Sequence, residues 1–143
     1  MRFLAPAGDC LKLSDLKGKK VVVYFYPKDD TSGCTLEAID FTKARAAFDA
    51  AGTTVVGISP DSEESHCEFR DKHKLGITLA ADPEHKAIEA YGVWVEKTNY
   101  GRKYMGVQRA TFLVGADGRI AREWRNVKVP GHVEEVLAAA SAL

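Results

Sequence analysis

The fold is decided by the stretch VVVYFYPKDDTSGC, residues 21–34. Its first part, Val21 to Tyr26, is a continuous run of β-branched and aromatic residues, which predicts a strand buried in a parallel sheet. Pro27 ends the run, a polar loop follows, and Cys34 opens a segment whose apolar residues recur at helical spacing. A thiol at a helix start lies in the positive field of unpaired amides and the helix dipole, which favours the thiolate. The stretch therefore predicts a strand, a loop and a reactive cysteine.

The rest of the chain alternates between strand and helix patterns. After Cys34 we expect one long helix that ends at Gly52, a natural helix stop. The next helix starts either with Ser59 as the cap, or with Asp61 as a cap that pairs with Glu64. The remaining elements are expected as a strand or turn at 11–16, strands at 53–58, 77–80, 110–114 and 119–124, and helices at 59–73, 82–91 and 132–143.

The order of these elements predicts the architecture. Strands and helices alternate first, and the last two strands form an antiparallel hairpin through the Ala116-Asp117-Gly118 turn. This order implies a mixed central sheet with helices on both faces. We therefore predict an α/β thioredoxin-like sandwich, formed as a single domain by residues 1–143, a length that suits one domain with a proper core.

Composition narrows the class of protein. Twenty Lys and Arg balance twenty Asp and Glu, so nothing points to nucleic acid or to an anionic membrane surface. No apolar run approaches the length of a spanning helix, and the start is too short and broken for a signal peptide, so we expect a cytoplasmic protein. Three cysteines exclude a fully paired intrachain disulfide scaffold and suit free thiols.

The loop and helix start carry a recognisable motif. Pro27, Thr31 and Cys34 form the pattern P-x-x-x-T-x-x-C, which resembles the active-site motif of peroxiredoxins. The wider sequence is similar to the peroxiredoxin Q branch, also called bacterioferritin-comigratory protein. Further matches are Gly33-Cys34-Thr35-x-Glu37, Tyr91-Gly92-Val93-Trp94, Tyr100-Gly101 and Arg109-x-Thr111-Phe112. The resemblance runs from about residue 11 to the end of the chain.

The resemblance implies a thiol peroxidase that reduces hydrogen peroxide and organic hydroperoxides. Cys34 would be the nucleophile, and the Thr31 hydroxyl would hydrogen-bond the peroxide. Arg109 would supply the positive charge that favours the thiolate, and Glu37 would orient that arginine. Pro27 would shield the thiolate from water. The implied partners are a hydroperoxide substrate and thioredoxin or a similar dithiol reductant, with no cofactor and with a monomeric enzyme.

The sequence departs from the family at the second cysteine. Many members carry a resolving cysteine five residues after the first, where this chain has Ile39, and others carry it where this chain has Arg70. Cys67 lies one turn earlier on the same helix, on the side opposite Phe69. Two routes stay open, one in which Cys67 resolves the oxidised Cys34 and one in which an external thiol does so.

Two other functional classes compete with a thiol peroxidase. A thiol–disulfide oxidoreductase needs a Cys-x-x-Cys pair, and the segment Cys34-Thr35-Leu36-Glu37 does not provide one. A redox-sensing or chaperone-like binding module that uses Cys34 remains the alternative, and catalytic turnover separates it from a peroxidase. No metal is expected, because His66-Cys67 has no second cluster of ligands.

We expect no catalytic role for the histidines, the tryptophans, Cys10 or the basic segment that follows Trp94. We expect His66, His73, His85 and His132 on the surface, and Cys10 in a turn. Trp94 and Trp124 are interpreted as core or pocket-rim residues. The segment 97–103, with its three basic side chains, is expected to be a solvated loop that could meet an acidic partner.

Overall fold

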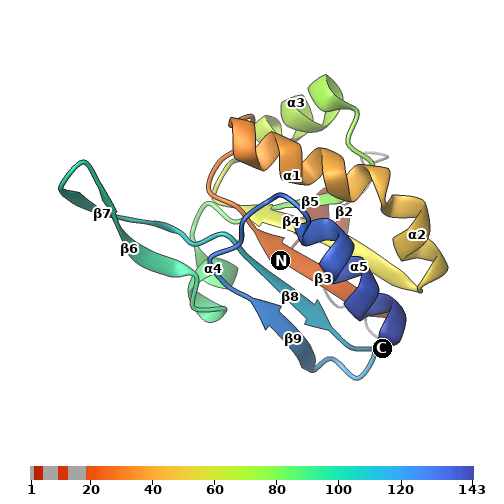
Figure 1. The fold of residues 1–143 in the computed structure, drawn as a ribbon. Helices are drawn as coiled ribbons and strands as arrows, with labels where there is room; N and C mark the ends of the chain where they lie inside the picture. Colours follow the sequence, from red (N-terminus) through yellow and green to blue (C-terminus); the bar gives the residue numbers. More distant parts are fainter. Residues whose placement is uncertain (1, 5–9, 13–18) are drawn as a thin grey trace.

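A computed structural model describes residues 2–4, 10–12 and 19–143 of the chain (Figure 1). In these residues seven strands form one mixed sheet in the order β2-β1-β5-β4-β3-β8-β9. Their bounds are β1 Arg2–Leu4, β2 Cys10–Lys12, β3 Lys20–Phe25, β4 Thr53–Ser59, β5 Thr78–Ala81, β8 Ala110–Val114 and β9 Ile120–Trp124. The helices are α1 Ser32–Lys43, α2 Arg45–Ala50, α3 Glu63–His73, α4 Lys86–Ala90 and α5 His132–Ala142.

Strand β3 lies at the centre and positions the start of α1. It pairs in parallel with β4 and antiparallel with β8, so Tyr24 lies between Gly57 and Thr111. Gly57 is required at this register, because a Cβ there would lie 2.7 Å from the Tyr24 ring. The mixed sheet predicted from the element order is confirmed.

The side chains of β3 alternate between two hydrophobic layers. Val22, Tyr24 and Tyr26 face the layer that contains α1, α2 and α5, together with Phe69 of α3. Val21, Val23 and Phe25 face the opposite layer, which contains Ile88 of α4. Figure 1 shows α1, α2 and α5 together on one face of the sheet. Burial on both faces explains why residues 21–26 are apolar throughout.

The expectation of one long helix after Cys34 is wrong, because the segment forms two helices that break at Ala44. The side chain of Thr42 donates a hydrogen bond to the carbonyl of Ala38 one turn earlier, at 2.8 Å. Such bonds compete with the backbone ladder and bend helices. The Thr42 hydroxyl also accepts a hydrogen bond from the amide of Gly76, which anchors the break to the chain before β5.

Both predicted starts of α3 are wrong. The cap is Ser62, whose hydroxyl accepts the amide of Ser65 at 3.1 Å. Asp61 and Ser59 are engaged elsewhere, because the Ser59 hydroxyl donates to Asp61 and the same carboxylate oxygen accepts the amide of Asp29. Helix α4 is also shorter than expected, since Asp82 accepts amides of residues 86 and 88 from outside the helix.

The expected basic loop at 97–103 is a hairpin, with β6 Trp94–Asn99 paired to β7 Arg102–Val107. It projects away from the sheet in Figure 1. Its turn residues Tyr100 and Gly101 have φ of 50° and 77°, the signs of a type I′ turn, which suits the twist of a hairpin. Tyr100 is 99% exposed. Cys10 lies in strand β2 instead of a turn, and residues 13–16 of the segment expected at 11–16 lie outside the described residues.

Candidate active site

Cys34 lies in the first turn of α1, beneath a loop that leaves the central strand β3. Thr31 is the cap residue, with an extended backbone, and its carbonyl accepts the amide of Thr35 at 2.8 Å to begin the helix. Cys34 is 1% exposed and packs in the hydrophobic layer that contains Tyr24. The thiol is therefore at the positive end of a helix and out of bulk water.

The side chain of Arg109 contacts the sulfur of Cys34 from a neighbouring part of the sheet, since β8 pairs with β3. It lies just before β8, and its Nη2 donates to Cys34 Sγ at 3.1 Å although the two residues are 75 positions apart. Its Nη2 also lies 3.3 Å from the place that a Cβ on Gly33 would occupy. Glycine at position 33 thus lets the guanidinium approach the helix backbone closely. The predicted proximity of Arg109 to Cys34 is present in the structure.

Glu37 completes the set one turn further along α1. Arg109 Nη1 donates to Glu37 Oε1 at 2.6 Å, so one guanidinium bridges the carboxylate and the sulfur. Glu37 is 0% exposed, and its Oε2 has no partner among the described residues. Burial raises the pKa of Glu37 to about 7, and the attraction of Arg109 opposes that shift only in part.

The electrostatics of Arg109 reflect both neighbours. Burial alone would lower the pKa of Arg109, but Glu37 and Cys34 outweigh burial and the net shift is upward. The side chain of Arg109 is 17% exposed and therefore poorly hydrated. A fixed cation in such a setting acts on the sulfur more strongly than it would in water.

Thr31 and Pro27 flank the thiol along the chain. The Thr31 hydroxyl is exposed and donates to the carbonyl of Lys28 at 2.9 Å. It therefore does not cap α1 with its side chain, and its oxygen faces the solvent side of the site. Pro27 is partly buried at the end of β3. Among the described residues neither side chain forms a hydrogen bond with Cys34.

Cys67 lies on α3, and both Cys34 and Cys67 are free thiols. Cys67 is partly buried, so it is less exposed than its position opposite Phe69 suggested. Ile39, which occupies the family's usual second-cysteine position, is also partly buried against the core. The two thiols do not form a disulfide with each other in the part of the chain that the structure describes.

Two histidines expected on the surface are buried. His66 is 0% exposed, and its ring nitrogens lie against Asp29 and the carbonyl of Ala80. His132 is 5% exposed, and its Nε2 lies 2.7 Å from the Thr111 hydroxyl. Burial lowers the pKa of His132. The signal for His66 was its spacing, because it lies three positions before Phe69 and so on the same helix face.

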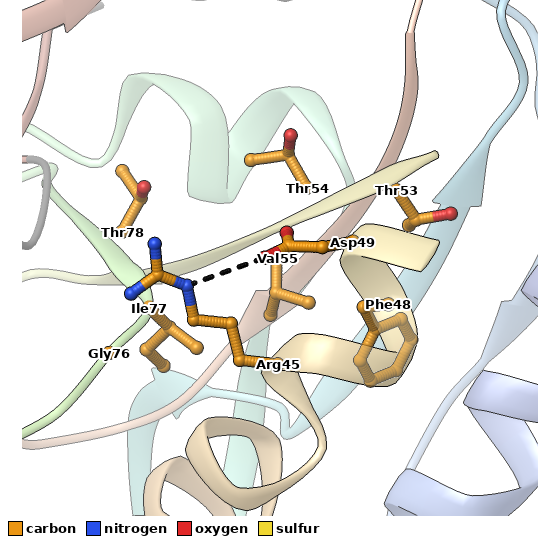
Figure 2. A pocket seen from close by; sticks show the side chains of 9 residues that line it. All are labelled: Arg45, Phe48, Asp49, Thr53, Thr54, Val55, Gly76, Ile77 and Thr78. Carbon is orange, nitrogen blue, oxygen red and sulfur yellow. Dashed lines mark ion pairs between the residues drawn. The ribbon is translucent and has the colours of Figure 1, made fainter. Parts of the chain in front are cut away.

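A separate pocket of about 170 Å³ lies on α2, β4 and the chain that enters β5. Figure 2 shows its nine lining side chains, with Arg45 paired to Asp49 at 3.7 Å. None of the predicted site residues lines it. Among residues 2–4, 10–12 and 19–143, no group of three or more His, Cys, Asp or Glu could hold a metal ion. In the same residues, no helix has the length and apolar character needed to cross a bilayer.

Comparison with known proteins gives a consistent result. The model of the AhpC/TSA family matches residues 3–123. The chain is 51% identical over 130 residues to peroxiredoxin Bcp of Bacillus subtilis, covering 91% of this chain and 83% of the relative. It is 49% identical over 130 residues to a putative peroxiredoxin Bcp of Coxiella burnetii, covering 91% and 86%.

Solved structures resemble the whole fold. The bacterioferritin comigratory protein of Xanthomonas campestris, studied for its alkyl peroxide reduction activity, superposes with a TM-score of 0.91 at 38% sequence identity. The match covers 99% of this chain and 90% of that one. The thioredoxin-like sandwich predicted from the element order is thereby confirmed.

Proposed function

The chain belongs to the peroxiredoxin Q, or Bcp, branch of the AhpC/TSA family, whose members are thiol peroxidases, and we propose that Cys34 carries its reaction. The observation that supports this assignment is the 3.1 Å contact from Arg109 Nη2 to Cys34 Sγ at the start of α1. A guanidinium and a helix N-terminus act on one buried sulfur. Both stabilise negative charge, which is what a sulfur that acts as a nucleophile requires.

In the first step the Cys34 thiolate attacks one oxygen of a hydroperoxide. An S–O bond forms, the O–O bond breaks, and the other oxygen leaves with the electron pair as alkoxide or hydroxide and takes up a proton. The sulfur is oxidised by two electrons to a sulfenic acid, and the peroxide is reduced to an alcohol or to water. Arg109 Nη2 donates to the reacting atoms, and the exposed Thr31 hydroxyl binds the peroxide.

Glu37 and Pro27 act through their neighbours in this proposal. Glu37 fixes one arm of the Arg109 guanidinium, so that the other arm stays on the sulfur. Pro27 has no amide and ends β3 rigidly, which limits the access of water to the thiolate.

In the second step a thiol attacks the Cys34 sulfenic acid, releasing water and forming a disulfide, which thioredoxin or a similar dithiol then reduces. The attacking thiol is either Cys67 or one from the reductant. Because Cys34 is 1% exposed, either route requires the first turn of α1 to open. We further infer a monomeric enzyme, acting as one domain over residues 1–143, in a reducing cytoplasm that suits its free thiols.

The assignment is tested by peroxide turnover. We expect the purified protein to consume many equivalents of hydrogen peroxide with a thioredoxin system, and Cys34→Ser to abolish consumption. Cys10→Ser is the matched control, since it removes a thiol that neither proposed route uses. Consumption that stops at one equivalent would indicate a redox sensor, and undiminished turnover in Cys34→Ser would refute the role of Cys34.

The resolving thiol is identified by mass spectrometry after one equivalent of peroxide without reductant. A Cys34–Cys67 disulfide identifies Cys67 as the resolving residue. A sulfenic acid that persists on Cys34 beside a free Cys67 thiol identifies the external route.

A further inference from the structure

The loop that precedes Cys34 is tied to helix α3 by a buried polar cluster, which among the described residues forms no hydrogen bond to the proposed catalytic side chains. We name this cluster, made of Tyr26, Asp29, Ser65 and His66, the loop clamp. Tyr26 follows β3, Asp29 lies in the middle of the loop, and the other two residues lie in the first turn of α3. The clamp joins two segments of the chain that are far apart in sequence.

Both carboxylate oxygens of Asp29 are bonded inside the clamp. Oδ1 accepts the Tyr26 hydroxyl at 2.6 Å. Oδ2 accepts the Ser65 hydroxyl at 2.8 Å and lies 2.7 Å from His66 Nδ1. The backbone amide of Asp29 is also held, by the side chain of Asp61 at 2.8 Å. Asp29 is 7% exposed, so these bonds replace its hydration almost completely.

The ring of His66 fixes the direction of these bonds. Its Nε2 lies 3.0 Å from the carbonyl oxygen of Ala80 in β5, which only accepts, so Nε2 must carry a hydrogen. Its Nδ1 then faces a carboxylate, and a hydrogen bond at 2.7 Å requires a second proton between the two groups. His66 is fully buried and anchored on strand β5, so the loop is bonded to the rigid sheet through the imidazole.

We propose that Asp29 and His66 are positioning residues that hold the loop in the arrangement where Thr31 can bind a peroxide above Cys34. The inference rests on the proposed role of Cys34. Thr31 lies only two residues after Asp29, and its hydroxyl bonds to the loop carbonyl of Lys28, which directly precedes Asp29. When the clamp parts, the loop loses its buried attachment to α3 and Thr31 moves with it. Arg109 approaches from β8 and keeps its hold on the sulfur.

The neighbouring carboxylate provides a matched control. Asp30 bonds to α3 as well, to Lys72 Nζ at 2.6 Å and His73 Nε2 at 2.8 Å, but this contact is exposed. Its φ of 59° is left-handed, a conformation that asparagine also adopts readily. Asp29→Asn and Asp30→Asn therefore make the same chemical change in the same loop, one inside the clamp and one outside it.

The test compares two rate constants for Cys34 in folded protein, well below the melting temperature. Rapid mixing with hydrogen peroxide, followed by quenching and mass spectrometry, measures oxidation, which needs the ordered loop. Alkylation by iodoacetamide measures the thiolate, which depends on Arg109. We expect Asp29→Asn to slow oxidation about tenfold without slowing alkylation, and Asp30→Asn to leave both within twofold of the parent.

Three results would overturn the proposal. They are an oxidation rate constant for Asp29→Asn less than threefold below the parent, an equal fall in oxidation and alkylation, and an equal effect of Asp30→Asn. Should Asp29→Asn fail to fold, Tyr26→Phe removes a single donor and decides in its place, with a fall of twofold or more in oxidation supporting the clamp and a smaller fall overturning it. A parent that consumes peroxide only when Cys34 is intact keeps the proposed function standing in every case.

Discussion

Two buried carboxylates lie near Cys34, Glu37 in the helix after it and Asp29 in the loop before it. Each faces a basic side chain, Arg109 for Glu37 and His66 for Asp29, at 2.6 and 2.7 Å. They differ in how completely they are bonded. Glu37 leaves Oε2 without a partner among the described residues, whereas both oxygens of Asp29 are bonded. Similar pairs of groups can therefore serve different purposes.

The difference follows from what each pair must do. Arg109 divides its donors between Glu37 and the sulfur, so the carboxylate bonds to only one arm of the guanidinium. A Glu37 with an unbonded oxygen leaves part of the positive charge for Cys34. Asp29 has no such competitor, and each added bond restricts the loop further. In our proposal one pair sets the charge at the sulfur, and the other sets the position of a loop.

The largest effect that would break this comparison is expected at Arg109. Arg109→Lys keeps the charge but cannot reach both Glu37 and Cys34 in the fork geometry, so we expect the rate constant for oxidation by hydrogen peroxide to fall about 100-fold. Arg125→Lys is a matched control, because Arg125 also uses two donors, to the carbonyls of Gly92 and Tyr91, away from the thiol. A fall of less than fivefold at Arg109 would contradict the charge-setting role.

A pH series sharpens the comparison at Glu37. Because burial raises the pKa of Glu37 to about 7 from 4.5, the folded state keeps a proton between these pH values that the unfolded state has released. The stability contributed by this group is present below pH 4.5 and is lost as the pH rises through 7. The free energy of unfolding of the parent should fall by about 3 kcal/mol relative to Glu37→Gln over that window.

Urea unfolding at pH 4.5, 5.5 and 7 measures this difference. Glu135→Gln is the control, since that carboxylate is exposed beside Arg122. A parent that gains stability relative to Glu37→Gln as the pH rises would show that the ion pair with Arg109 outweighs burial.

The smallest effect is expected from two neighbouring tyrosines of the β3 segment. The Tyr24 hydroxyl is buried without a partner among the described residues, whereas the Tyr26 hydroxyl donates to Asp29. Tyr24→Phe should leave the free energy of unfolding within about 0.5 kcal/mol or raise it, and Tyr26→Phe should lower it by about 2 kcal/mol. Thermal and urea unfolding of both variants measures these changes. Equal losses of unfolding free energy would show that the bonded Tyr26 hydroxyl contributes no more than the unbonded Tyr24 hydroxyl.

The sequence was sufficient where the deciding signals are local. The apolar run of β3, the proline and the helix start of Cys34 lie within fourteen residues, and each predicts its element by itself. The two-helix break at Ala44 was missed, because it depends on a side-chain bond of Thr42 to Ala38 and on the amide of Gly76. The β6–β7 hairpin was missed because its strands carry charged residues without an apolar alternation.

The candidate site also contains residues that local sequence signals predict and residues that only long-range contacts reveal. Arg109 is 75 positions from Cys34, and family resemblance, not spacing, placed it there. His66 could have been found from its three-residue spacing to Phe69, but a histidine beside a cysteine reads equally well as a surface residue. Asp29 looks like an ordinary loop residue until α3 is packed against it.

Gly33 has one further consequence. The distance between the Arg109 guanidinium and the helix is set there by an atom that is missing, since Nη2 lies 3.3 Å from where a Cβ would be. Because no Cβ occupies this position, Nη2 can come close enough to the helix to contact Cys34 Sγ at 3.1 Å. A single methyl group at position 33 would move the Arg109 guanidinium outward by a few tenths of an ångström without removing any catalytic side chain. We therefore expect the reactivity of Cys34 to depend on a residue that has no chemistry of its own.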